Sequence, residues 1–243
     1  MAAAKRISGR GYDDAEIAAV CRARDYPYPP FAGCFVFQEG EARAAAADRL
    51  PREGRVPVLA YGSNRAPAQL FRKFGPRAEA IGVETVDVWG CEVVFCARLS
   101  SYGALPAMLQ QAEGTTVRVA VTWLTDRQLE VMDVTEGLRE GEYRRVVLPW
   151  GSVTGADGLP LHGVETYDSP HPALYIGGGP VALSAVEASG RVLPAMSCAA
   201  ALAHAHGHLS PDMSCEDAIL RSIRDHDHRE ELCLRLREGL PPL

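Results

Sequence analysis

Two short stretches of this chain combine residue types that could carry out chemistry. In the first, "AYGSNR", the residues Tyr61, Gly62, Ser63 and Asn64 place a tight turn directly after an apolar run. Successive main-chain amides in such a turn can point into one concavity and bind an anion or an oxyanion. An ordinary strand–turn–helix junction, in which Asn64 merely caps the helix, explains the same letters. The stretch is not a phosphate-binding loop of the Walker type, because the glycines and the lysine of that motif are missing.

The second stretch, "VMDVTEG", brings Glu136 to the expected end of a helix, directly before Gly137. A carboxylate there faces the negative end of the helix dipole, which costs roughly a few tenths of a kcal/mol. Glu136 is therefore a candidate general acid or base, provided that the site is partly buried. The alternative is a solvated glutamate before a helix-ending glycine, and this segment taken alone favours that alternative.

Short apolar runs between turn residues predict the strands that would position both stretches. We expect strands over 56–61, 80–88, 91–97, 106–110, 115–123, 143–149, 161–167 and 173–176. Two helices are expected among them, 66–74 and 126–134, and the second begins with the capping-box spacing of Thr125 and Gln128. Outside this region, helices are predicted over 15–24, within "EGEARAAAADRL", and from Cys215 to about Glu238 after the N-cap Ser214.

This order of elements predicts an α+β fold with a mixed β-barrel and flanking helices, because the strands do not alternate regularly with helices. We divide the chain into an N-terminal extension (1–55), a core (56–186) and a C-terminal helical extension (187–243). The C-terminal helices are expected to pack on the core or on a second copy, so a homodimer is compatible with the sequence.

Taken together, the two stretches resemble the γ-glutamylcyclotransferase family over about half of the chain, Val56 to Val186. The family loop Tyr-Gly-Ser-Asn is matched by residues 61–64. The family pattern Leu-Asp-x-x-Glu-Gly, followed by Tyr-x-Arg, is matched by residues 132–137 with Met at the first position, and then by Tyr143 and Arg145. A third stretch, "SPHPALYIGG", is similar to a Ser-Pro-rich family segment with a substrate-side tyrosine, here Tyr175.

The resemblance implies a γ-glutamylcyclotransferase-like fold and a reaction that needs no cofactor and no metal. The α-amine of a γ-glutamyl amide would attack its own γ-carbonyl, and 5-oxoproline and a free amine would be released. Glu136 would move the proton, and the loop Tyr61–Asn64 would hold substrate oxygens. Arg65 stands where the family usually has an apolar residue. We expect it either on the surface or at the rim of the pocket, where it would bind an acidic leaving group.

The composition of the chain argues against several other classes of protein. The net charge of -6 and the absence of basic runs are not those of a nucleic-acid-binding protein. No apolar window is long enough for a membrane span, and no secretory signal is evident. The seven widely spaced cysteines are typical of a reducing compartment, so we expect a cytoplasmic protein. His204 with His208, and His226 with His228, have the spacing of paired ligands, but we expect no metal.

Three functions therefore compete. The first is a γ-glutamyl-directed cyclotransferase acting on a small-molecule γ-glutamyl substrate, and the two extensions leave room for a larger amine of the natural-product type. The second is another acyl-transfer or amide-hydrolysing enzyme, in which Glu136 activates water or an external amine. The third is a non-catalytic ligand-binding module on the same fold. Release of 5-oxoproline rather than glutamate separates the first from the second.

Overall fold

A computed structural model describes residues 11–148 and 152–242 of the chain. The helices are α2 (Asp14–Arg24), α3 (Pro67–Phe74), α4 (Asp126–Thr135), α5 (Cys198–Leu209), α6 (Cys215–Arg224) and α7 (His226–Arg237), with the short 3-10 helices η2 (Ala47–Arg49) and η3 (Ser63–Arg65). The strands are β1 (Phe35–Gln38), β2 (Glu41–Ala44), β3 (Val56–Ala60), β4 (Ile81–Phe95), β5 (Ala107–Leu124), β6 (Arg144–Val147), β7 (Ser152–Thr154), β8 (Pro160–Leu161), β9 (Glu165–Asp168), β10 (Tyr175–Ile176), β11 (Gly179–Pro180), β12 (Ala182–Leu183), β13 (Glu187–Ser189) and β14 (Ala195–Met196).

The fold is α+β, with one large mixed sheet whose main path runs β14-β12-β4-β5-β3-β9-β6. Its centre is the long antiparallel pair of β4 and β5, which shifts register between Trp89 and Cys91. In the described part of the chain the end strands β6 and β14 do not pair with each other, so the expected barrel does not close. Both end strands are short, and neither supplies the second row of backbone bonds that closure requires.

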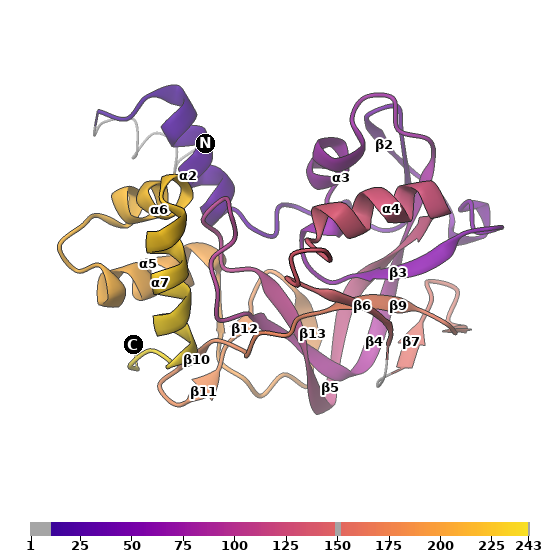
Figure 1. Ribbon diagram of the computed structural model, residues 1–243. Coiled ribbons are helices and arrows are strands. Elements are labelled where there is room, and N and C mark those ends of the chain that lie inside the picture. Colours follow the sequence, from indigo (N-terminus) through magenta and orange to yellow (C-terminus); the bar gives the residue numbers. More distant parts are fainter. Residues whose placement is uncertain (1–10, 149–151, 243) are drawn as a thin grey trace.

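Helices lie on two sides of the molecule (Figure 1). The helices α5, α6 and α7 pack against one another, and α2 from the other end of the chain packs on α5 and α6. On the other side, α3 packs against α4 over the sheet. The larger apolar core joins the first helical group to the sheet, and a smaller core lies beneath α3 and α4.

Several expected elements differ from the structure. The strands expected over 80–88 and 91–97 are one strand, β4, and those over 106–110 and 115–123 are one strand, β5. The helix expected from 215 to 238 is two helices, because Asp225 has an extended backbone and its side chain accepts a hydrogen bond from the His228 amide. Asp225 thus ends α6 and caps α7.

The segment "EGEARAAAADRL" was expected to be helical because it is rich in alanine, and this prediction is wrong. It forms β2 and η2, and β2 pairs with β1, which in turn pairs with β4. Pairing with β1, which is itself held by β4, outweighs the helix propensity of alanine. Strands β1 and β2 precede residue 56, while β13 and β14 follow residue 186, so both expected domain boundaries fall inside the sheet.

Candidate active site

The loop after β3 is held in place by two tyrosines. The Tyr61 hydroxyl donates a hydrogen bond to the main-chain oxygen of Tyr167, 2.5 Å away, which ties the loop to β9. A Cβ at Gly62 would lie 2.5 Å from the Tyr26 hydroxyl, so only glycine fits this close approach. The Tyr26 hydroxyl also accepts a hydrogen bond from the Ala107 amide. An N-terminal residue and β5 therefore shape the loop together.

Glu136 is positioned by the end of helix α4. The helix begins with the predicted capping box of Thr125 and Gln128, and Glu136 is its C-cap residue. The next residue, Gly137, has a φ of 68° and lets the chain turn away from the helix. The Glu136 amide donates a hydrogen bond to the Met132 oxygen and so fixes the backbone at this position. The Glu136 side chain extends from there towards the loop.

The structure brings the two predicted stretches into contact. Asn64 Nδ2 donates a hydrogen bond to Glu136 Oε1 at 3.0 Å, although the residues lie 72 positions apart. The ammonium group of Lys73, in the last turn of α3, forms an ion pair with the same oxygen. Both donors use Oε1, and within residues 11–148 and 152–242 no hydrogen bond occupies Oε2. The free oxygen can therefore accept a proton from a bound molecule.

Lys73 is a site residue that the sequence reasoning missed. Its side chain is only 4% exposed and that of Glu136 is 16% exposed, so the pair is largely shielded from water. A lysine in the last turn of a helix is usually explained by the helix dipole alone, so its position in the sequence does not mark it as a site residue. Here the lysine neutralises the charge of the glutamate at a place largely shielded from water.

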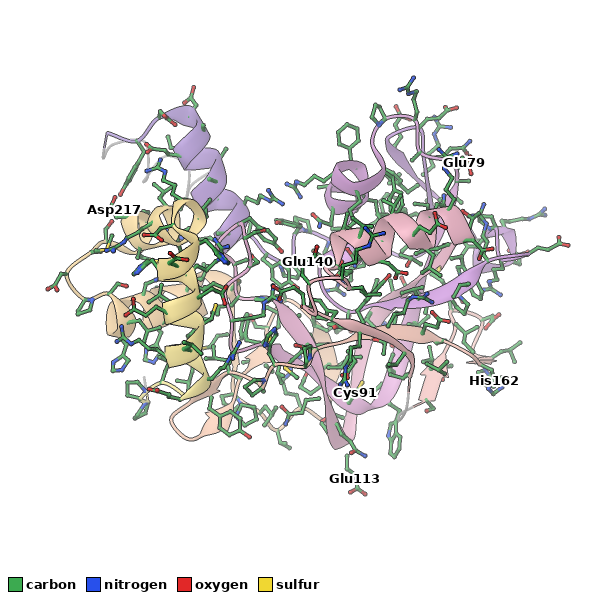
Figure 2. The ribbon with its side chains drawn as sticks, viewed as in Figure 1. Glu79, Cys91, Glu113, Glu140, His162 and Asp217 are labelled. Carbon is green, nitrogen blue, oxygen red and sulfur yellow. The ribbon has the colours of Figure 1, made fainter. Side chains whose placement is uncertain are left out.

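A cavity of about 380 Å³ opens in front of this pair. Its walls come from the loop, from the segment after α4, from residues 98–102 and from helix α7, so the C-terminal extension forms one side of it. Figure 2 shows one lining residue, Glu140, between the helical group on the left and α4 on the right. Asn64 Oδ1 is buried and has no hydrogen-bond partner in the described structure. Asn64 Oδ1 and Glu136 Oε2 are thus two acceptors without a hydrogen-bond donor in the described structure.

Tyrosines make up much of the inner wall. Tyr26, Tyr61 and Tyr143 line the cavity, and burial raises the pKa of each hydroxyl well above its ordinary value. They are therefore neutral at physiological pH. Each hydroxyl already forms a hydrogen bond to the main chain. Their hydrogen bonds point to a role in shaping the wall rather than in proton transfer.

The outer wall carries charges of both signs. Arg98 forms an ion pair with Glu142, and its guanidinium lies 5.8 Å from the centre of the Tyr143 ring. His171 lies 3.5 Å from the Glu142 carboxylate, and burial together with the charge of Arg98 lowers the pKa of its ring. A polar molecule with charged substituents fits this rim better than an apolar one.

Asp133, the other acidic residue of the second stretch, supports the site from outside. It accepts hydrogen bonds from Arg145 Nε at 3.0 Å and from the Tyr167 hydroxyl at 2.7 Å. Arg145 also pairs with Glu165 on β9. This network joins α4, β6 and β9, and thereby fixes the helix that ends at Glu136.

Five of the predicted site residues line the cavity, namely Tyr61, Gly62, Ser63, Asn64 and Glu136. Two others are not among its lining residues. Tyr175 lies in β10, where its side chain is 45% exposed. Arg65 was expected on the surface or at the rim of the first cavity, and it lies at neither. It is only 7% exposed and lines a second cavity. Its side chain instead bonds main-chain oxygens of neighbouring segments.

The histidine pairs do not form metal clusters in the described structure. Within residues 11–148 and 152–242, no group of three or more His, Cys, Asp or Glu side chains could hold a metal ion. The His204 ring bonds the main-chain oxygen of Pro241, and the His226 ring bonds Arg229. In the same part of the chain, no helix has the length and apolarity needed to cross a membrane.

Comparison with known proteins gives only distant likenesses. No family model and no curated protein matches the chain. Among solved structures, an uncharacterized human protein has a TM-score of 0.40 and 18% identity, covering 49% of this chain and 70% of its own. A gamma-glutamyl cyclotransferase has a TM-score of 0.39 and 16% identity, covering 49% and 69%. The Arabidopsis thaliana protein At5g39720.1 has a TM-score of 0.38 and 23% identity, covering 49% and 72%. These values are too low to carry a functional conclusion.

Proposed function

We propose that the protein is a γ-glutamylcyclotransferase-like enzyme that releases 5-oxoproline and a free amine from a γ-glutamyl amide. The observation that carries the proposal is the convergence of Asn64 and Lys73 on one oxygen of Glu136 inside a cavity. A carboxylate held in this way keeps its second oxygen for a proton in transit. The reaction class needs such a group next to an amine.

The substrate's α-ammonium would bind between Glu136 Oε2 and Asn64 Oδ1, the two acceptors that the described structure leaves unoccupied. Asn64 and Lys73 both hold Glu136 through Oε1, so Oε2 stays available to take the proton of the substrate's ammonium. The free amine is then a nucleophile. Because it belongs to the same molecule as the γ-carbonyl, holding the chain folded supplies a large part of the rate enhancement.

The chemical step balances without any further reactant. The amine nitrogen forms a bond to the γ-carbon, and the carbonyl oxygen takes up negative charge. When the tetrahedral intermediate collapses, the bond from the γ-carbon to the leaving nitrogen breaks. Glu136 delivers the first proton to that nitrogen and then takes a second one from the attacking nitrogen, so a five-membered lactam with one N–H remains. The second proton passes to the released amine, which leaves as its ammonium form. Gly62 can line the cavity only with its backbone, so its main chain is a candidate contact for the substrate's oxygens.

The leaving amine would lie against the outer wall. Residues of α7, among them Arg229, Glu230 and Arg237, line that end of the cavity. Their mixed charges suit an amine that carries further polar groups. This placement supports a leaving group larger than a single amino acid, which would give the C-terminal extension a role in substrate selection.

A panel of γ-glutamyl amides with different amines tests the proposal, with 5-oxoproline, free glutamate and the released amine each quantified by mass spectrometry. We expect equal amounts of 5-oxoproline and amine, and no glutamate. Release of glutamate would instead assign the cavity to an amide hydrolase. Binding of an amide without turnover would leave a ligand-binding module.

A further inference from the structure

Arg65 lines a second cavity, of about 260 Å³, that shares no lining residue with the first. Its walls include the apolar side chains of Phe31, Phe35 and Val83. Arg118 and Ala185 also line it. The residue is only 7% exposed, so the guanidinium is held inside the protein rather than in water.

The guanidinium is only partly satisfied by the protein. Its two terminal nitrogens donate hydrogen bonds to the main-chain oxygens of Arg118, at 3.2 Å, and Ala185, at 3.1 Å. The Nε donor is buried and has no partner within residues 11–148 and 152–242. In the same ranges no carboxylate lies within ion-pair distance of Arg65.

The neighbouring charged residues do not neutralise the guanidinium of Arg65. Arg118 forms two hydrogen bonds to Asp87, so that carboxylate is already engaged. Glu187 lines the same cavity, but its side chain is 74% exposed and it forms an ion pair with Arg118, at 4.0 Å. Burial lowers the pKa of Arg65, yet a guanidinium stays protonated in proteins. A buried charge without a counter-ion is costly, which calls for an anion from outside.

We propose that the second cavity binds a small monocarboxylate with an apolar body. Its carboxylate would accept a hydrogen bond from Arg65 Nε and neutralise the guanidinium, while its apolar part would pack on Phe31, Phe35 and Val83. A cavity of about 260 Å³ lies below the range of about 300–1,000 Å³ typical of drug-sized ligands, so the ligand is small.

The location of Arg65 gives this site a connection to the first cavity. Ser63, Asn64 and Arg65 form the single turn of η3, and Asn64 bonds Glu136. A ligand that restrains Arg65 also restrains the turn that presents Asn64. The site is thus placed to influence the geometry around Glu136, whatever reaction the first cavity carries out.

Titration calorimetry with benzoate as the probe, and benzamide as its uncharged counterpart, tests the proposal directly and does not depend on activity. We expect saturable binding of benzoate to the wild-type protein and none of benzamide. Arg65→Met removes the guanidinium and should weaken benzoate binding by at least about tenfold. Ala185→Trp keeps Arg65 but obstructs the exposed edge of the cavity, and it should have a similar effect.

Arg98→Met, which removes a cation from the wall of the first cavity, serves as the matched variant there and should bind benzoate as the wild type does. If Arg65→Met does not fold, as judged by circular dichroism, Ala185→Trp decides the outcome. The proposal is overturned if the wild type shows no saturable binding, if benzamide binds equally well, or if benzoate binding survives both second-cavity variants. Loss of binding in Arg98→Met would place the probe in the first cavity and overturn the proposal as well.

Discussion

Asn64 and Arg65 are neighbours in the chain, yet they serve two cavities with different electrostatic arrangements. On the Asn64 side, the carboxylate of Glu136 meets the ammonium of Lys73, so the buried charges cancel. On the Arg65 side, a buried guanidinium meets only main-chain oxygens in the described structure. The same turn of η3 thus connects a charge-balanced cavity with one that carries a net positive charge.

This difference indicates how each cavity would meet a ligand. In the first cavity the ion pair already fixes the glutamate, and in the described structure Glu136 and Asn64 each have an acceptor that could bind a donor such as an amine. In the second cavity, Arg65 has a donor without a partner among the described residues, which could bind an acceptor such as a carboxylate. Substitutions that remove one member of each arrangement show whether the contrast is functional.

The largest effect is expected for Glu136→Gln. Glutamine keeps the shape and the contact with Asn64 but cannot take up the amine proton, so turnover of a γ-glutamyl amide should fall by about 10²–10⁴-fold. Rates of 5-oxoproline release at saturating substrate measure this. Glu130→Gln, on the exposed face of the same helix, should keep the wild-type rate. A Glu136→Gln enzyme that turns over at the wild-type rate would place the base elsewhere.

Lys73→Met comes next. Without the cation, Glu136 keeps only the bond from Asn64, and we expect kcat/KM to fall by about 10- to 100-fold, in line with loss of one hydrogen bond to a charged group.

The control for this variant is Arg72→Met in the same helix. Arg72 lies over the Tyr28 ring, outside the Glu136 pair, so the substitution should leave kcat/KM unchanged. If Lys73→Met keeps the wild-type kcat/KM, the ion pair is only structural. Lys73→Arg, which keeps the charge, should recover part of the activity.

How far the sequence could predict this arrangement depends on which residues had local signals. The capping box at Thr125 and the turn-forming letters after β3 mark the two segments, and the resemblance links them, so the contact between Asn64 and Glu136 was within reach. Lys73 and Tyr26 had no such signal. A lysine at the end of a helix and a tyrosine before a proline are common on any surface. Their burial depends on tertiary packing alone.

The errors in the predicted fold also arise because tertiary packing decides features that have no local signal in the sequence. One strand break was expected, at residues 89–90, but the long pairing of β4 with β5 continues through the register shift there. An alanine-rich segment was expected to be helical, but β1 offered it a partner strand. Arg65 was expected in water or at a rim because arginine is seldom buried. Only the packing of β5 and the segment after β12 explains where its guanidinium goes.

A smaller effect is expected for Gly62→Ala, which tests how the charge-balanced cavity depends on the N-terminal segment. The new Cβ would lie 2.5 Å from the Tyr26 hydroxyl, so the loop or the tyrosine must shift. We expect a loss of about 1–3 kcal/mol of unfolding free energy, measured in urea, with reduced activity. Gly207→Ala is the control, because nothing lies within 4 Å of its Cβ and it sits inside α5.

A double variant gives that prediction its sharpest form. Tyr26→Phe removes the hydroxyl that the new methyl group would meet, at the cost of the hydrogen bond from the Ala107 amide. Gly62→Ala combined with Tyr26→Phe should therefore lose less stability than the sum of the two single variants. Strictly additive losses would show that the close approach of Tyr26 does not constrain the loop.

The smallest effect at neutral pH is expected for His206, a buried polar group with neither counter-ion nor hydrogen bond in the described structure. Burial, with a smaller contribution from the charge of His228, lowers the pKa of its ring from 6.5 to about 4. The unfolded chain takes up a proton near pH 6.5 and the folded protein only near pH 4. The contribution of His206 to the free energy of unfolding is therefore fully present above pH 6.5 and is lost as the pH falls towards 4, by about 3 kcal/mol.

The variant His206→Leu should have nearly the wild-type free energy of unfolding at pH 7.5, and this free energy should fall less steeply between pH 6.5 and 4.5. His208→Gln, on the exposed side of the same helix, should follow the wild-type curve. If the unfolding free energies of His206→Leu and the wild type run parallel against pH, the ring is protonated in the folded protein. His206 would then carry a buried charge, as Arg65 does.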